Sequence, residues 1–129
     1  MPTKPMPIKR ILIVDDEECI QTVVKFGVQM LVDWEVLIAS SGLQGLKTAC
    51  DQKPDAILLD VMMPDMDGIA TFKALQADPQ TTEIPVIFLT AKAQTSERRQ
   101  FDDLGVSGVI TKPFNSLDLP DLIAKILDW

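Results

Sequence analysis

Five short apolar runs alternate with five longer segments along the chain, and this alternation is the strongest constraint on its fold. The runs are rich in Ile, Val and Leu, as in strands that are covered on both faces. The segments between them repeat apolar residues every three or four positions, which is typical of amphipathic helices. The expected strands cover residues 8–14, 34–39, 56–59, 85–89 and 109–111, and the expected helices cover residues 20–31, 43–50, 69–75, 95–104 and 119–127. This repeat predicts an α/β fold, a doubly wound (βα)5 sandwich around a five-stranded parallel sheet.

The length of 129 residues fits one domain. We expect an extended lead-in over residues 1–7, which contain three prolines, and a single domain over residues 8–129. No apolar run approaches the ~20 residues that span a bilayer, and no secretion signal is recognisable. We therefore expect a cytoplasmic protein without a membrane partner, in which Cys19 and Cys50 are free thiols.

Charge and composition exclude several functional classes. The chain has 12 Lys and Arg against 19 Asp and Glu, for a net charge of -7. This charge opposes a nucleic-acid backbone, so we expect no direct nucleic-acid partner. The sequence contains no histidine. A Ser-His-Asp triad, a His-ligated zinc site and a role as phosphohistidine donor are therefore excluded.

Polar side chains stand at the carboxyl end of four of the five expected strands. They are Asp15 and Asp16 after the first strand, Asp60 on the third, Thr90 on the fourth and Lys112 after the fifth. Taken singly, each has an ordinary explanation, such as a helix start, a turn residue or a solvated lysine. In a parallel sheet, however, all carboxyl ends lie along one edge, where doubly wound folds bind their ligands. The sequence therefore predicts one shared site.

The composition of this site indicates metal-assisted phosphoryl transfer. Carboxylates that crowd together need a cation, and hard oxygen ligands favour Mg²⁺. We expect Asp16 and Asp60 to bind Mg²⁺ directly, Asp15 to bind it through water, and the backbone carbonyl of Met62 to complete the protein ligands. Asp60 is then the nucleophile that accepts a phosphoryl group. Lys112 is expected to neutralise one phosphoryl oxygen, and the Thr90 hydroxyl to donate a hydrogen bond to another.

These residues stand in motifs that resemble those of a known family, the receiver domain of two-component response regulators. The matching segments are residues 13–17 (IVDDE), 59–68 (LDVMMPDMDG), 89–91 (LTA) and 111–114 (TKPF). The resemblance implies the flavodoxin-like strand order 2-1-3-4-5 and a cis peptide bond between Lys112 and Pro113. It also implies a sensor histidine kinase or phosphotransfer protein as donor. Catalysis would be limited to the domain's own phosphorylation and dephosphorylation.

The output of such a switch is harder to infer. Because no further domain follows Trp129, we expect a stand-alone receiver whose signal passes to a protein partner or a phosphorelay. The resemblance implies an output surface, and a homodimer contact, on the fourth helix, fifth strand and fifth helix, including Lys92, Arg98, Arg99 and Val109. Val109 replaces the aromatic residue that usually couples to Thr90. We therefore expect phosphorylation to shift the sparsely apolar helix at 95–104 and the preceding loop.

The resemblance also implies two positions that tune the lifetime of the phosphorylated state. They are Met62, two residues after Asp60, and Lys92, two residues after Thr90. Both are expected to border the route of the attacking water. The bulk of Met62 leads us to expect an aspartyl phosphate that lasts for minutes or longer.

Two other functions remain open from the sequence. One is a phosphatase of the haloacid dehalogenase type, although that family carries its nucleophile on the first strand. The other is a scaffold that keeps the fold without the switch. The start of the last helix is also open: Asp118 can cap it together with Asp121, or Asn115 can cap an earlier start.

Overall fold

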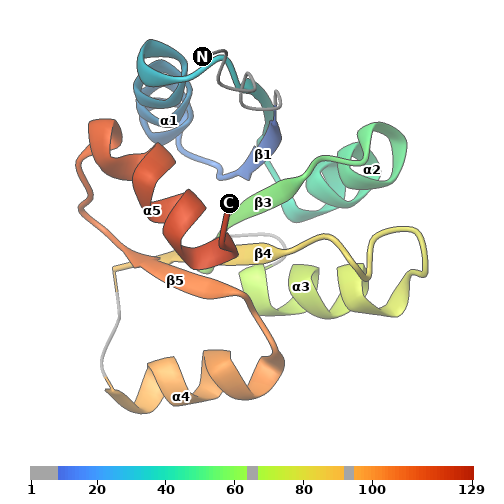
Figure 1. The fold of residues 1–129 in the computed structure, drawn as a ribbon. Coiled ribbons are helices and arrows are strands. Elements are labelled where there is room, and N and C mark those ends of the chain that lie inside the picture. Colours follow the sequence, from blue (N-terminus) through green and yellow to red (C-terminus); the bar gives the residue numbers. More distant parts are fainter. Residues whose placement is uncertain (1–8, 64–66, 92–94) are drawn as a thin grey trace.

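A computed structural model of the chain describes residues 9–63, 67–91 and 95–129, except for the side chains of residues 95–98 and 102. It forms an α/β sandwich with helices on both faces of one sheet (Figure 1). The strands are β1 (Arg10–Val14), β2 (Glu35–Ala39), β3 (Ala56–Asp60), β4 (Val86–Thr90) and β5 (Gly108–Thr111). The helices are α1 (Glu18–Leu31), α2 (Gly42–Gln52), α3 (Gly68–Ala77), α4 (Thr95–Leu104), the 3₁₀ turn η1 (Ser116–Asp118) and α5 (Leu119–Leu127).

The five strands are all parallel and stand in the order β2-β1-β3-β4-β5, which confirms the expected fold class and topology. Successive side chains of a strand point to opposite faces. Ile11 and Ile13 pack with α1 and α5, whereas Leu12 and Val14 pack with the side of α2, α3 and α4. Each inner strand is therefore buried on both faces, which explains why its sequence is an almost unbroken apolar run.

Element boundaries differ from the expected ones at the strand starts. The first strand begins at Arg10, and the second begins at Glu35, one residue after Trp34. The expected lead-in at 1–7 lies outside the described residues. The third strand extends to Asp60 itself, so this carboxylate belongs to the strand and is not a residue of the following turn.

Of the two caps left open for the last helix, the structure shows the one at Asn115. Asp118 precedes α5, but its backbone is helical and its side chain makes no capping hydrogen bond. Asn115 instead accepts a hydrogen bond from the Leu117 N–H and begins the η1 turn that leads into α5. The 3₁₀ turn therefore directly precedes α5. Pro120 lies in the first turn of α5, where a missing N–H is tolerated.

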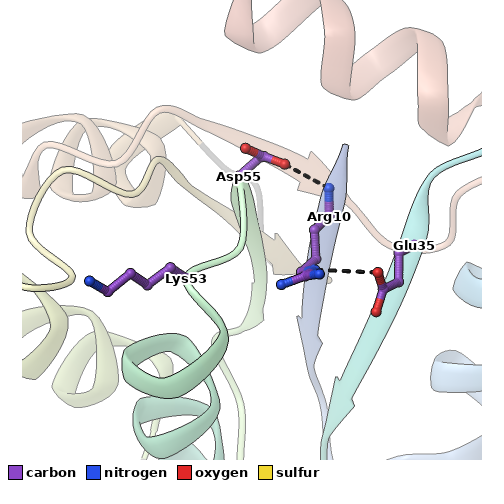
Figure 2. A pocket seen from close by; sticks show the side chains of 4 residues that line it. All are labelled: Arg10, Glu35, Lys53 and Asp55. Atoms are coloured by element: carbon purple, nitrogen blue, oxygen red, sulfur yellow. Dashed lines mark hydrogen bonds and ion pairs between the residues drawn. The ribbon is translucent and has the colours of Figure 1, made fainter. Parts of the chain in front are cut away.

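The amino-terminal edge of the sheet is held by Arg10 (Figure 2). Its backbone N–H donates to Asp55 Oδ2 at 2.8 Å, and its Nε donates to Glu35 Oε2 at 3.3 Å. Its Nη1 donates to the Gln52 carbonyl at the end of α2, at 3.1 Å. Lys53 extends away from this group. Arg10 therefore ties β1 to β2, to α2 and to the start of β3, on the edge opposite the polar strand ends.

No helix in the described part of the chain is both long enough and apolar enough to cross a bilayer.

Candidate functional site

The structure brings the polar strand ends together at the carboxyl edge of the sheet. Asp60 is the last residue of β3, which lies between β1 and β4. Asp15 directly follows β1, and Thr90 ends β4 opposite Thr111 of β5. Lys112 comes next, and its backbone N–H donates to the Thr90 carbonyl at 2.8 Å. The four neighbouring strands β1, β3, β4 and β5 therefore deliver the predicted residues to one place.

Three carboxylates form the acidic part of the site. One carboxylate oxygen from each of Asp15, Asp16 and Asp60 lies within 4.8 Å of the other two. Asp15 and Asp60 are buried, whereas Asp16 is exposed. Hard oxygens gathered at this spacing, and open to solvent on one side, fit a divalent cation that keeps part of its water shell. The donor set is therefore suited to Mg²⁺.

Lys112 supplies the positive charge of the site. Its Nζ lies 3.2 Å from Asp15 Oδ2 and 3.4 Å from Asp60 Oδ1, so one ammonium group bridges two buried carboxylates. The Lys112–Pro113 peptide bond is cis, as expected. Because this side chain is largely buried, the ion pairs are weakly screened by water.

The electrostatics leave Asp60 short of compensating charge. Burial raises the pKa of Asp60, and the nearby Asp15 raises it further, although the Met62 N–H and Lys112 act in the opposite direction. Burial also tends to lower the pKa of Lys112, but Asp15 and Asp60 outweigh it, so the pKa of Lys112 is raised. The lysine therefore stays charged, and a further cation would favour the ionised form of Asp60.

The loop after β3 holds the Asp60 carboxylate through a backbone hydrogen bond. The Met62 N–H donates to Asp60 Oδ1 at 3.1 Å, while the Met62 side chain is exposed. Farther along, Gly68 begins α3, and its N–H donates to the Val61 carbonyl at 2.9 Å. A Cβ at Gly68 would lie 2.4 Å from the Asp60 carbonyl oxygen. Glycine is therefore needed for α3 to start this close to the end of β3.

The residues expected to transmit the signal are only partly described. Thr90 is buried at the end of β4. Val109 is half-buried on β5, in register with Phe88, and borders a groove with Leu122 and Ile126 of α5. Arg99 is exposed on α4. Lys92 and the Arg98 side chain lie outside the described residues, so their roles, and that of Val109, stay predictions.

α4 is anchored to the core by Phe101 and Leu104. Phe101 is buried and packs edge-on against Phe88, with 5.1 Å between the ring centroids. Leu104 is half-buried against the same core cluster.

Two contributors to the site were not predicted from the sequence. Gln21 on α1 is buried, and its Nε2 donates to the Asp15 carbonyl. The available signal was a polar residue next to the buried Val24 side of an amphipathic helix. Asp67 caps α3, where its Oδ1 accepts from the Ala70 N–H at 2.7 Å. The signal there was an Asp two residues before the expected helix start at residue 69.

Known proteins are similar to this chain in sequence and in fold. The family model for the response regulator receiver domain matches residues 11–124. The DNA-binding dual master transcriptional regulator RpaA of Synechocystis is 36% identical over 117 residues, which are 91% of this chain and 47% of that protein. The chain spans about half the length of curated relatives such as this one.

Solved structures agree with this match. Chemotaxis response regulator CheY4 of Vibrio cholerae has a TM-score of 0.86 at 28% identity, over 93% of this chain and 99% of that one. The receiver domain of sensor histidine kinase PA1611 from Pseudomonas aeruginosa has a TM-score of 0.83 at 28% identity, over 95% of this chain and 100% of that one. The latter structure has a magnesium ion coordinated in its active site cleft.

The family model covers nearly all of the described chain, and the segments that carry the site lie inside it. A dehalogenase-type phosphatase would carry its nucleophile on the first strand, whereas the central carboxylate here ends the third. The chain belongs to the response regulator receiver domain family.

Proposed function

We propose that the chain is a phosphorylation-activated switch in which Asp60 accepts a phosphoryl group from a partner histidine kinase or phosphotransfer protein. Receiver domains of two-component systems are signalling switches, and this chain is one of them. The observation that carries the proposal is the single ammonium group of Lys112 between two buried carboxylates, with Asp16 exposed beside them. Such a site has the nucleophile, the fixed cation and the metal ligands that phosphoryl transfer requires.

Each residue has a separate role in the proposed reaction. An Asp60 oxygen attacks the phosphorus of the donor's phosphohistidine, the P–N bond breaks, and the imidazole leaves with the electron pair. Lys112 neutralises one phosphoryl oxygen and Thr90 donates a hydrogen bond to another. When bound by Asp16, Asp60, the Met62 carbonyl and, through water, Asp15, Mg²⁺ would offset carboxylate charge and polarise the phosphoryl group. We propose no other substrate for this chemistry.

The output is proposed to be a contact with another protein. The named relatives include a DNA-binding regulator of about twice this length. The net charge of -7 favours a protein partner over nucleic acid for these 129 residues. The groove between β5 and α5 at Val109 supports the α4-β5-α5 side as the output surface and as the contact of a homodimer. If beryllofluoride binding leaves the backbone NMR shifts of residues 91–108 unchanged, this output surface is wrong.

Labelling with a small acyl phosphate tests the proposal. Wild type should gain one phosphoryl group by intact mass when Mg²⁺ is present, and Asp60→Asn should gain none. Asp67→Asn is the matched control, because Asp67 is an acid on the same loop that serves as a helix cap, and Asn caps equally well. Labelling of Asp60→Asn at the wild-type level would refute the assignment of Asp60. A label on wild type that does not depend on Mg²⁺ would refute the metal site.

A further inference from the structure

We propose that Gln21 is a positioning residue, which holds the backbone of the Asp15–Asp16 turn in the shape that metal binding needs. The inference rests on the proposed function, because it concerns the same metal site. Within the described part of the chain, the Gln21 side chain bonds to none of the three carboxylates. Its partners are a backbone carbonyl and a serine hydroxyl.

Gln21 is well placed to fix this turn. Its side chain lies on the buried side of α1 and is 7% exposed. Its Nε2 donates to the Asp15 carbonyl at 2.6 Å and to Ser40 Oγ at 3.1 Å. One amide group therefore uses its two protons on two different segments, the turn after β1 and the turn after β2. Two directional hydrogen bonds fix both the position and the rotation of the amide plane.

Apart from Gln21, few contacts hold the turn after β1. The Asp15 N–H donates to the Ala39 carbonyl at 3.1 Å, and Asp15 Oδ1 accepts from the Glu17 N–H at 2.9 Å. Lys112 holds the other oxygen of the Asp15 carboxylate. Gln21 is therefore the side chain, among the residues that the structure describes, that fixes the Asp15 carbonyl.

Asp16 depends on this backbone more than its neighbours do. Asp15 and Asp60 have hydrogen bonds and an ion pair on their carboxylates, whereas the exposed Asp16 carboxylate has neither within the described part of the chain. The direction of its side chain is therefore set by the peptide planes of the turn. The Asp15 carbonyl lies in one peptide plane with the Asp16 N–H, so a rotation of that carbonyl also turns the Asp16 backbone. The Asp16 oxygen then leaves the group of three. Outer-shell hydrogen bonds of this kind typically change metal affinity by about 10–100-fold.

A purely structural role makes a different prediction. If Gln21 only satisfies a buried carbonyl, its loss lowers stability and leaves Mg²⁺ affinity unchanged. If it positions the turn, its loss weakens Mg²⁺ binding beyond any change in stability. A measurement of Mg²⁺ affinity on folded protein separates the two roles.

The test uses Gln21→Met, which keeps the length of the side chain and removes its donors. By isothermal titration calorimetry we expect the Mg²⁺ Kd to rise by about tenfold. The rate of labelling by a small acyl phosphate should fall similarly at limiting Mg²⁺ and recover at saturating Mg²⁺. In metal-free protein, amide exchange at Glu17 should become faster. An unchanged Mg²⁺ Kd in a folded Gln21→Met variant overturns the proposal, whatever the exchange rate at Glu17.

Thr81→Val is the control for the loss of a buried hydrogen bond elsewhere. Thr81 is buried between α3 and β4, and its Oγ1 donates to the Leu75 carbonyl at 2.7 Å. Its replacement should lower the free energy of unfolding and leave the Mg²⁺ Kd unchanged. An equal loss of Mg²⁺ affinity in Thr81→Val would mean that stability alone explains the effect, and would overturn the role of Gln21.

Ser40→Ala provides a second variant in case Gln21→Met does not fold. It removes only the outer partner of the Gln21 amide, at an exposed position. We expect the Mg²⁺ Kd to rise by about twofold to threefold, in the same direction as for Gln21→Met. An unchanged Kd in this variant, if it is the only one that folds, overturns the proposal. Absence of labelling and of Mg²⁺ binding in wild type is a separate result, which refutes the proposed function itself.

Discussion

The two edges of the sheet carry the same kinds of charged residue in opposite arrangements. At the amino edge, Arg10 pairs with the exposed Glu35, and its backbone N–H donates to Asp55 (Figure 2). At the carboxyl edge, one lysine bridges Asp15 and Asp60, both buried, while Asp16 lies beside them without a positive partner in the described chain. At the amino edge, opposite charges pair and are exposed to solvent. At the carboxyl edge, acidic groups outnumber the cation, and most of them are buried.

This difference separates a structural cluster from a functional one. Exposed ion pairs are screened by water and contribute little to the free energy of unfolding. In the buried cluster, charges are poorly screened by water. The pKa of Asp60 is therefore raised, mainly by burial and further by the negative charge of Asp15. A cation or a phosphoryl group can therefore change the energy of the carboxyl edge far more than that of the amino edge.

The largest effect should come from removing the cation of the carboxyl edge, with removal of the amino-edge cation as the comparison. Lys112→Met leaves Asp15 and Asp60 buried without a positive partner, and we expect a loss of about 3–5 kcal/mol in the free energy of unfolding without metal. Arg10→Met removes an exposed pair and one carbonyl hydrogen bond, and should cost no more than about 1 kcal/mol. Urea denaturation of both variants gives the comparison. Equal losses would contradict the distinction between the two edges.

Replacing a glycine should also cost more stability at the carboxyl edge than at the amino edge. Gly68→Ala places a Cβ 2.4 Å from the Asp60 carbonyl oxygen, so α3 has to move, at a cost of about 2–3 kcal/mol. Gly105, in the turn before β5, has a φ of 95° but open space around it. Gly105→Ala should therefore cost only about 1 kcal/mol of backbone strain. Thermal denaturation measures both, and labelling at Asp60 should slow only in Gly68→Ala.

Neutralising one acid should stabilise the carboxyl edge. Without metal at pH 7, we expect Asp60→Asn to raise the free energy of unfolding by about 1 kcal/mol, or roughly 4 °C in Tm. Because the pKa of Asp60 is raised in the fold, the ionised carboxylate disfavours folding above that pKa. The gain should therefore shrink as the pH falls through the pKa of Asp60. With Mg²⁺ added, wild type should gain more stability than the variant.

If Asp60→Asn is no more stable than wild type at pH 7 without metal, Lys112 already balances the cluster, and the proposed charge deficit is wrong.

The smallest effect is expected at the amino edge. Glu35→Gln removes the charge that faces Arg10 and should lower the free energy of unfolding by no more than about 0.5 kcal/mol. This difference should vanish in high salt, because both side chains are exposed. Denaturation at low and high ionic strength measures it. A loss that persists in high salt would show that the amino edge is less screened than its exposure indicates.

Much of the fold could be predicted because it depends on local patterns. The apolar runs that become the inner strands, such as residues 56–59, are continuous because both faces of a parallel strand are covered. Convergence of Asp15, Asp60, Thr90 and Lys112 followed from topology alone, since strand ends share an edge whatever their separation in sequence. The start of the last helix stayed open, because Asn115 and Asp118 are both ordinary caps; in the fold Asn115 caps the η1 turn, and Ser116 of that turn lies close to Gly27 of α1.

The sequence by itself determined which chemical groups the carboxyl edge contains: the acids, the hydroxyl and the lysine, each placed by its position at the end of an apolar run. Only the tertiary structure decided how they are shared. In the fold, Lys112 forms ion pairs with both Asp15 and Asp60, and Asp16 is exposed. Gln21 of α1 donates a hydrogen bond to the Asp15 carbonyl. The physical reason is that strand position follows from local pattern, whereas burial and side-chain partnership depend on contacts between segments far apart in the chain.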